Sequence, residues 1–285
     1  MLNMKIKDTI RFFFAKIFSK KTVLFSSMDD WEWAIRKRIT GYVPFFYEFD
    51  EINPNYFDVI IPLTLHSQRY INAHRELFAK QLYLCPTEYC IELCDNKEIF
   101  HNFLSKNGFQ KLMPMINGKF DYPYILKKKV GAWGEGISII SDMKSEMKHI
   151  ADIESEDYFT QQYIKGKDEY TAHIITADKT IIFFKALKFT FQDECFIKGK
   201  DYKPMSVVEV EHDKYKSIFE EVLSSMNYEG ICCFNYKITK NGLSIFEVNP
   251  RFGASMNRFI NGALIYYSIC GAPNKKSSVS KKTHH

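Results

Sequence analysis

Residues 124–140 read YILKKKVGAWGEGISII and place a glycine-rich loop between two apolar strands, expected at residues 124–128 and 137–140. A P-loop or a Rossmann dinucleotide fingerprint instead leads from a strand through its glycines into a helix. Because a second strand follows here, the sequence excludes both motifs and predicts a strand–loop–strand hairpin. Such a loop is able to fold its backbone N–H groups over phosphate oxygens, although the loop alone favours an ordinary hairpin turn.

The three lysines of this stretch are compatible with nucleic acid, a membrane surface or a phosphate. The chain of 285 residues has 39 Lys and Arg against 34 Asp and Glu, a net charge of +5. This mixed and modest charge does not require a nucleic-acid groove. In a strand, alternate side chains share a face, so Lys127 and Lys129 point to one side and Lys128 to the other.

The segment IFEVNPRFG, residues 245–253, carries polar groups at alternate positions of an expected strand and its extension: Glu247, Asn249 and Arg251. With a period of two, these three side chains share one face. A carboxylate and an amide oxygen suit a magnesium ion, and a guanidinium suits an anionic transition state. The segment therefore favours a site for a magnesium-bound polyphosphate over a purely structural strand.

Cysteine and histidine usage argues against a metal cage built from these residues. The seven cysteines show no paired CxxC spacing, and the eight histidines lack zinc-site spacing. This pattern predicts a reduced, cytoplasmic setting. No apolar run reaches the roughly 18 residues that a membrane-spanning helix needs.

The order of patterns along the chain predicts an α/β protein with four segments. Short strands at 22–27 and 57–64, each followed by a helical pattern, indicate a small α/β domain over residues 22–85. Residues 86–270 form a second domain, which opens with a helix through Leu104 and continues with strands at 124–128, 137–140, 158–164, 170–175 and 180–191. Helices at 143–150 and 215–226 and a hairpin over 230–253 complete it, and the polar tail 271–285 is expected to be disordered.

Residues 1–21 interleave lysines and arginine with isoleucine and phenylalanine, as in MKIKDTIRFFFAKIFSKK. The charges interrupt the apolar residues throughout, unlike a secretory signal or a membrane-spanning helix. One interpretation is an amphipathic helix that rests on an anionic membrane. The other, which we favour from sequence alone, is a first helix packed on its own domain.

The order of these pieces over roughly residues 85–255 resembles the ATP-grasp superfamily, of the carboxylate–amine or carboxylate–thiol ligase type with an ATP-binding domain like that of carbamoyl phosphate synthase. The resemblance implies an ATP-grasp fold with a lid subdomain at about 122–190 and a small pre-ATP-grasp domain before it. It also implies ATP and Mg as cofactors.

The resemblance assigns site residues by matching motifs. The nucleotide-binding set is Lys97, Lys127, the loop residues Gly131, Trp133, Gly134 and Gly136, and the hinge and ribose residues Gln161, Gln162, Ile164 and Glu169. Gln162 and Ile164 are expected to contact adenine through their backbone. The magnesium ligands are Glu247, Asn249 and Asn235, the last standing where the family usually has an acid or glutamine, and Arg251 is the expected acyl-phosphate contact.

Two further lysines, Lys185 and Lys188, lie on a strand expected to approach the same cleft. They are candidate contacts for a substrate carboxylate or the γ-phosphate, although an exposed strand face that carries lysine is the commoner explanation.

The implied activity is ATP- and Mg-dependent amide formation between a small carboxylate and a small amine through an acyl phosphate. An amino acid and a uronic acid of a surface polysaccharide are a hypothesis for the pair, with a cytoplasmic enzyme peripheral to the inner membrane. The alternatives are an ATP-grasp kinase and a non-catalytic nucleotide-binding protein. No nucleic-acid partner is expected, and a homodimer is compatible with the sequence.

Overall fold

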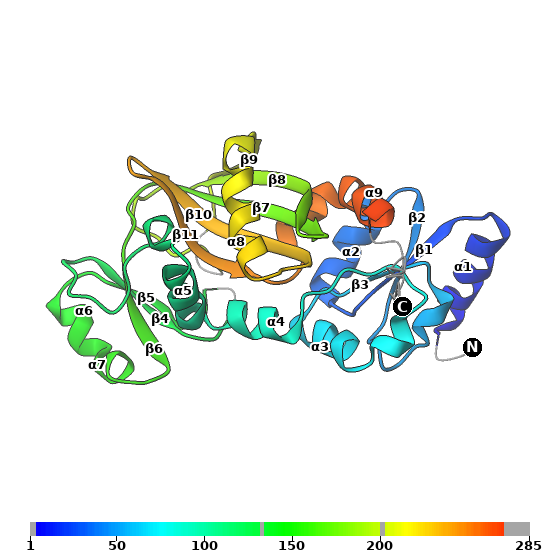
Figure 1. Cartoon of the computed structure of the whole chain (residues 1–285), viewed down its shortest axis with the longest axis horizontal. Coiled ribbons are helices and arrows are strands. Elements are labelled where there is room, and N and C mark those ends of the chain that lie inside the picture. Colours follow the sequence, from blue (N-terminus) through cyan, green and yellow to red (C-terminus); the bar gives the residue numbers. More distant parts are fainter. Residues whose placement is uncertain (1–3, 132–133, 200–202, 271–285) are drawn as a thin grey trace, which may run out of the picture. The chain divides into compact units, whose positions relative to one another are not determined.

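The computed structural model describes residues 4–131, 134–199 and 203–270 (Figure 1). The chain divides into two compact units, one of residues 1–85 with 254–285 and one of residues 86–253. We had assigned residues 254–270 to the second domain, and the contacts instead place them in the first unit. The reason is the Tyr267 hydroxyl, which donates to Ile60 O at 2.9 Å and accepts from Leu84 N at 2.6 Å. Trp133 and the tail 271–285 lie outside the described residues.

The first unit is built on the parallel sheet β2-β1-β3. Its elements are α1 (Ile6–Ile17), β1 (Lys21–Phe25), α2 (Asp29–Arg38), β2 (Tyr42–Phe46), β3 (Val59–Ile61), α3 (Leu65–Ala73) and α9 (Ile260–Cys270), with 3₁₀ turns at Pro54–Tyr56, Arg75–Phe78 and Ala254–Phe259. Val23, Leu24 and Phe25 of the central strand are fully buried, as parallel sheets covered on both faces require.

The second unit contains two antiparallel sheets, the central sheet β11-β10-β7-β8-β9 and the lid sheet β5-β4-β6. Its helices are α4 (Glu88–Asp95), α5 (Lys97–Lys106), α6 (Met143–Lys148), α7 (Ile150–Ile153) and α8 (Lys216–Ser225). Its strands are β4 (Tyr124–Lys128), β5 (Ile137–Ile140), β6 (Tyr158–Gln162), β7 (Asp168–Ala177), β8 (Thr180–Thr190), β9 (Ser206–Val210), β10 (Gly230–Thr239) and β11 (Gly242–Asn249). Short 3₁₀ turns occur at Gln110–Leu112 and Asp213–Tyr215.

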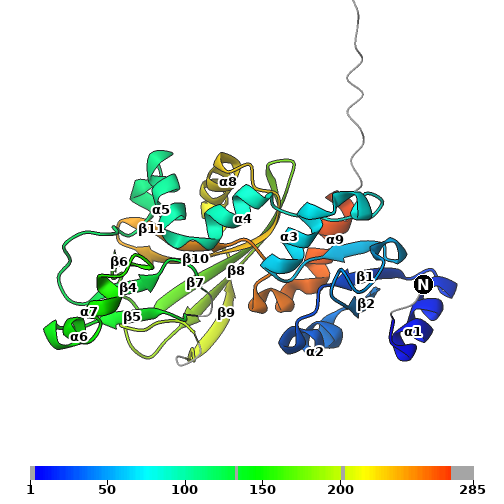
Figure 2. The same ribbon diagram turned by 90° about the horizontal axis from the view of Figure 1, so that it is seen from below.

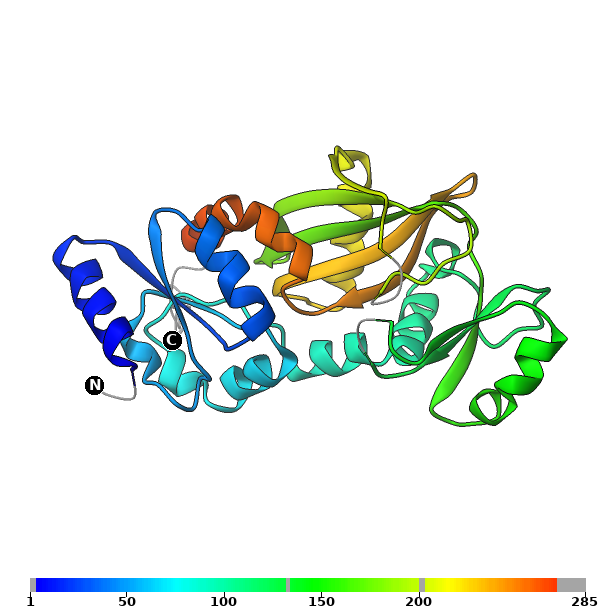
Figure 3. The same ribbon diagram turned by 180° about the vertical axis from the view of Figure 1, so that it is seen from behind.

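One face of the central sheet is covered by helices α4, α5 and α8: Figure 1 shows α8 in front of the strands, Figure 2 shows the three helices on the same side of them, and Figure 3 shows the sheet from behind. Phe100 of α5, Phe219 of α8 and Phe234 of β10 belong to the same buried apolar cluster. The lid sheet has a small cluster of its own around Leu126 and Ile140. Each sheet is therefore held by separate apolar contacts within this unit.

The helix expected to run unbroken to Leu104 is interrupted at Asn96. Asn96 is extended, with φ −92° and ψ 106°, and its side chain accepts from the backbone N–H groups of Glu98 and Ile99. This N-cap satisfies donors that the start of a helix leaves unpaired. As a result, Lys97 is the first residue of α5.

Strands β4 and β5 have the bounds expected from sequence, whereas β2 and β9 were not expected. Pro44 interrupts the β2 pattern, and proline is tolerated there because β2 is an edge strand. β9 is also an edge strand and is largely exposed, so its residues carry little apolar signal. Among the described residues, no helix is long and apolar enough to cross a membrane.

Candidate functional site

A cavity of about 790 Å³, part of it open to solvent, lies within the second unit. Its walls come from the lid sheet, from β7, β10 and β11 of the central sheet, and from the segment that follows β8. Residues far apart in sequence therefore meet in one site.

Most residues predicted from the family motifs line this cavity: Lys97, Lys127, Gly131, Gly134, Gln161, Gln162, Ile164, Glu169, Asn235 and Glu247. The sequence analysis did not identify several others: Ile125, Glu135, Ile137, Tyr163, Phe196, Ile197, Lys198, Lys237 and Phe246. The apolar residues of the second set could not be recognised as site residues from sequence, because isoleucine and phenylalanine are also common in hydrophobic cores.

Two buried lysines face one carboxylate in the cavity. Lys97 and Lys127 are 9% and 7% exposed. Burial lowers the pKa of Lys127, while the carboxylates of Glu247 and Glu169 oppose that shift. Burial acts to raise the pKa of Glu247, but the ammonium groups of Lys97 and Lys127 and two amide hydrogen bonds together hold it below its ordinary value. Glu247 is therefore an ionised group between two buried cations.

Two asparagines donate to the same oxygen of Glu247. Asn235 Nδ2 lies 2.7 Å and Asn249 Nδ2 3.1 Å from Glu247 Oε1. The other end of Asn235, Oδ1, accepts from Thr171 Oγ1 at 2.8 Å and from Lys198 Nζ at 3.2 Å. Asn235 thus connects Glu247 to Lys198, with its amide nitrogen toward the Glu247 carboxylate and its amide oxygen toward Lys198.

These residues fit one magnesium ion better than two. Among the described residues, no group of three His, Cys, Asp or Glu side chains gathers to hold a metal. Magnesium bound beside a nucleotide needs only one or two carboxylates, because phosphates and water supply other ligands. Glu247 meets that requirement. Asn249 and Asn235 both donate to Glu247, so each would offer an oxygen only if its amide rotates. For Asn235 that rotation would break the hydrogen bonds from Lys198 and Thr171, and its role as a ligand stays a prediction.

Lys198 was missed from the sequence because it lies in the irregular segment between β8 and β9. Its Nζ is 3.0 Å from Glu169 Oε1 and 2.8 Å from Thr171 Oγ1, and it lies 4.3 Å from the centre of the Phe189 ring. The signal that was available is the lysine in CFIKGK, which follows a strand of the same sheet.

The segment after β6 is held by two polar residues. Lys237 Nζ donates to Ile164 O at 2.9 Å and to Gly166 O at 2.8 Å. Tyr163 Oη donates to Glu194 O at 2.9 Å and accepts from Phe196 N at 2.8 Å, which ties this hinge to the segment that carries Lys198. Burial raises the pKa of Tyr163 well above its ordinary value, so the hydroxyl stays a donor.

One expected backbone contact of the hinge is already used within the protein. Gln162 N donates to Met115 O at 2.8 Å, so this N–H is not available to a ligand. The Gln162 side-chain oxygen accepts from Met115 N at 3.4 Å. Gln161, which is 4% exposed, keeps its place in the cavity wall.

The start of the glycine loop is attached to α5. Lys97 Nζ donates to Gly131 O at 2.7 Å, and Lys97 N donates to Lys129 O at 2.9 Å. Lys129 Nζ pairs with Glu98 Oε2 at 2.6 Å, so this lysine faces α5, whereas Lys128 is exposed. Of the three lysines of this stretch, Lys127 lines the cavity and Lys128 and Lys129 do not.

Gly136 does not line the cavity, but its backbone requires glycine. Its φ is +68°, and a Cβ placed there would lie 2.7 Å from Lys128 Cβ. Gly108 has a similar φ of +87° with nothing within 4 Å of its Cβ position.

We expect Gly136→Ala to destabilise the second unit by about 2 to 4 kcal/mol, because the strain of a left-handed backbone conformation adds to the steric overlap with Lys128 Cβ. Gly108→Ala, with strain alone, should cost about 1 kcal/mol. Thermal and denaturant unfolding of both variants measures the difference, and equal losses would show that the Lys128 contact relaxes at no cost.

Lys185 and Lys188 do not line the cavity, contrary to expectation. Lys185 Nζ pairs with Glu209, and Lys188 Nζ lies 3.6 Å from Asp168 Oδ2. The two positions are three apart in β8, so alternation points them to opposite faces of the sheet and a shared role was not possible.

Arg251 and Asn249 lie beside the cavity wall. β11 ends at Asn249, and Arg251 N donates back to Asn249 O at 2.8 Å, so the chain turns where we had extended the strand. Arg251 Nη1 donates to Phe252 O at 3.3 Å. The alternation argument therefore applies to Glu247 and Asn249, but not to Arg251.

One family of known proteins matches most of the second unit of this chain. A family model described as an ATP-grasp domain matches residues 94–255, more than half of the chain. A search of curated proteins found no match.

Three solved structures illustrate the likeness. Phosphoribosylamine–glycine ligase from Thermotoga maritima aligns with a TM-score of 0.63 and 15% identity, covering 88% of this chain and 76% of that chain. L-amino acid ligase from Bacillus licheniformis gives 0.58 and 14%, covering 88% and 73%. D-alanine–D-alanine ligase from Bacillus anthracis, solved with ATP, gives 0.57 and 12%, covering 88% and 95%. Such identities show the fold alone, and the predicted α/β class and ATP-grasp fold are confirmed.

Proposed function

The chain belongs to the ATP-grasp family, and from that premise we propose that it is an ATP-dependent ligase that activates a carboxylate as an acyl phosphate and joins it to an amine. The observation that carries the proposal is the pair of buried lysines, Lys97 and Lys127, beside the ionised Glu247 in one cavity. A purely structural site gains little from two buried cations, because desolvation opposes both. A triphosphate supplies the negative charge that such a pair lacks.

The hinge side of the cavity is the proposed adenosine site. Ile125, Ile137 and Phe246 give it apolar walls, and Gln161 supplies an amide. Since Gln162 N–H is used by Met115, the Ile164 N–H is the better proposed donor to adenine, with Lys237 holding the Ile164 carbonyl in place. Glu169 at the start of β7 is the proposed partner of the ribose hydroxyls.

The lysine side of the cavity is the proposed phosphate site. Lys97 and Lys127 would neutralise phosphate charge there, and Gly131 and Gly134 line the cavity beside them; a Cβ added at Gly134 would lie 3.2 Å from Lys198 O. Glu247 and Asn249 would hold magnesium, which when bound supplies charge neutralisation to the phosphates. Phosphoryl transfer depends chiefly on positioning and electrostatics, so no protein nucleophile is needed. Arg251, two residues beyond Asn249, remains the proposed acyl-phosphate contact.

Product analysis tests this reaction class. The protein is incubated with ATP, magnesium and panels of acids and amines, and we expect one ADP and one free phosphate per amide formed. A phosphorylated product that persists without free phosphate would identify a kinase instead. Failure to bind ATP or to release ADP with every pair would contradict catalysis altogether.

The finer form of the proposal is amide formation between an amino acid and a uronic acid of a surface polysaccharide. Its support is the small size of the chain and its basic, aromatic N-terminal segment. Uronic acid glycosides in the acid panel test it, and mass spectrometry of the products identifies the joined pair. Turnover with other acids but never with these glycosides would contradict this form and leave the ligase proposal standing.

Lys198 should contribute to turnover although no sequence motif marked it. Its ammonium contacts Glu169, Thr171 and Asn235 at the cavity wall, so it adds positive charge beside the residues proposed for the ribose and the metal. We expect Lys198→Met to lower ATP turnover about tenfold to a hundredfold, as loss of one charged contact to a transferring phosphoryl group does. Lys185→Met, at the exposed ion pair with Glu209, is the matched control. Wild-type ADP release by the Lys198 variant would exclude it from the site.

A further inference from the structure

Helix α1 is attached to the first unit by one narrow face. Phe12 and Ala15 are buried there, and the Phe12 ring packs at 6.0 Å from Phe45 and 5.9 Å from Phe57, centre to centre. In Figure 2 the helix lies beside β1 and β2 of the parallel sheet. These aromatic contacts fix which side of α1 faces the protein.

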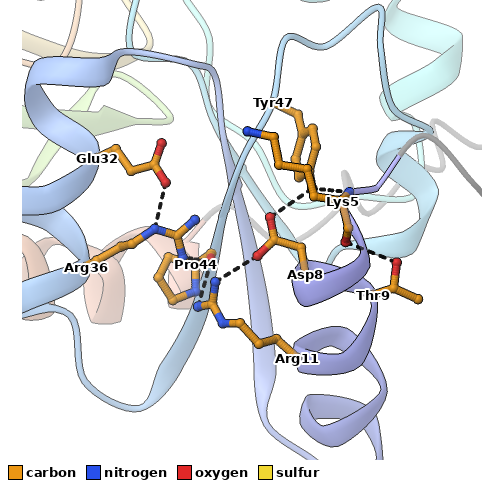
Figure 4. Close-up of polar contacts among 8 residues, drawn as sticks. All are labelled: Lys5, Asp8, Thr9, Arg11, Glu32, Arg36, Pro44 and Tyr47. Carbon is orange, nitrogen blue, oxygen red and sulfur yellow. Dashed lines mark hydrogen bonds and ion pairs between the residues drawn. The ribbon is translucent and has the colours of Figure 1, made fainter.

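The polar contacts of α1 also face inward, as Figure 4 shows. The Tyr47 hydroxyl donates to Asp8 Oδ2 at 2.8 Å. Arg11 Nη1 donates to Asp8 Oδ1 at 2.9 Å, and Arg11 Nη2 donates to Pro44 O at 3.2 Å. Asp8, the one acidic residue in the sequence of this helix, is therefore buried against Tyr47 and paired with Arg11 of the same helix.

The opposite side of α1 is apolar and exposed. Successive helix positions are about 100° apart, so five side chains fall in a sector directly opposite the buried one. They are Ile6, Ile10, Phe13, Phe14 and Ile17, with exposed fractions of 80%, 52%, 50%, 56% and 71%. We call these residues the outer face. The helix packs on its own unit, as we favoured from sequence, but that packing leaves these five apolar side chains exposed.

Basic residues border the outer face. Lys7 flanks it on one side and Lys16 on the other, and Lys20 and Lys21 follow the helix; all four side chains are exposed. Lys16 is paired with Asp58 at 3.2 Å. An apolar strip bordered by lysines complements a surface that is apolar below and anionic above, which is the boundary region of an anionic bilayer. A second copy of the same face would bring these lysines against one another.

We propose that the outer face of α1 docks in the plane of an anionic phospholipid bilayer. The isoleucine and phenylalanine side chains enter the boundary between head groups and acyl chains, and the lysines contact head-group phosphates. The proposal is independent of the reaction proposed for the cavity, because no residue of α1 lines that cavity.

Vesicle cosedimentation of the full chain tests the docking. We expect binding to phosphatidylcholine vesicles that contain phosphatidylglycerol and little binding to phosphatidylcholine alone. The triple variant Ile10→Ser, Phe14→Ser, Ile17→Ser keeps every charge and should weaken binding about a hundredfold, through the apolar area it removes. The matched control is Ile99→Ser, Met143→Ser, Met147→Ser, three side chains of the second unit that are 51%, 71% and 64% exposed.

A charge variant separates the two contributions. Lys7→Gln, Lys20→Gln, Lys21→Gln should weaken binding to anionic vesicles about fivefold for each lysine. The control is Lys111→Gln, Lys119→Gln, Lys148→Gln, at exposed positions elsewhere. Thermal unfolding should be unchanged in all variants, because the replaced side chains face solvent.

Three outcomes would overturn the proposal. They are equal binding to neutral and anionic vesicles, binding unaffected by the serine triple variant, and no vesicle binding by the wild-type chain. The mass of the wild type and the serine variant in solution is measured in parallel. A dimer that the serine substitutions dissociate, without vesicle binding, would assign the outer face to a second copy instead.

Discussion

Glu247→Gln is expected to lower magnesium-dependent ATP turnover by at least about a hundredfold, the loss typical when one strong electrostatic contact is removed from a reacting site. The carboxylate is the proposed metal ligand and the counter-charge of Lys97 and Lys127. Glutamine has the same shape but removes the charge, so the effect isolates electrostatics. ADP release and calorimetric titration of ATP with and without magnesium measure it.

The control for this variant is Glu209→Gln, at an exposed carboxylate of β9 that pairs with Lys185. It should leave turnover and ATP affinity unchanged. If Glu247→Gln keeps its dependence on magnesium, the assignment of Glu247 as metal ligand is wrong.

Glu247→Gln should also change how the free energy of unfolding depends on pH in the acid range. The pKa of Glu247 is lower in the folded chain than its ordinary value, so the group stabilises the fold above that ordinary value and loses this contribution as the pH falls through the folded pKa. We expect wild-type stability to fall on acidification from below about pH 4.3, the ordinary glutamate value. Glu247→Gln should be less stable at neutral pH and show a flatter acid limb in denaturant unfolding.

Lys127→Met is expected to lower ATP affinity about a hundredfold, because a charged hydrogen bond to phosphate in a buried site contributes up to about 3 kcal/mol. Lys127 is 7% exposed, and its ammonium lies 5.6 Å from the centre of the Phe246 ring in the cavity wall. Methionine keeps the length of the side chain and removes the charge. Calorimetric titration with ADP and with ATP measures the loss.

The adjacent Lys128→Met is the matched control, since Lys128 is exposed on the opposite face of β4. It should bind nucleotide as the wild type does. Equal losses in the two variants would mean that the net charge of the strand, and not the position of one ammonium, sets the affinity.

Much of the site was predictable from local patterns. Alternation in β4 separated Lys127 from Lys128, and the structure buries the first and exposes the second. Alternation in β11 placed Glu247 and Asn249 on one face, and their side chains are hydrogen-bonded. These inferences succeeded because a strand's period of two depends on the backbone alone.

Other residues needed the tertiary structure. Lys198 lies in an irregular segment and reaches Asn235 only because β7, β8 and β10 are neighbours in one sheet. The hydrogen bond from Gln162 N to Met115 O joins the hinge to a loop that no periodic pattern describes. The turn at Arg251 ends the alternation of side chains along β11, whereas the sequence pattern continues it to Arg251.

The sequence by itself determined the order of strands around the glycine loop and the separation of Lys127 from Lys128, because these depend on local spacing, and its motifs were enough to indicate the family. Only the tertiary structure decided which face of α1 meets the protein, that Asn235 links Glu247 to Lys198, and that residues 254–270 join the first unit. The physical reason is that an amphipathic helix has two faces that can pack, and an asparagine amide has both a donor and an acceptor end. Which side is used depends on neighbours brought together by folding.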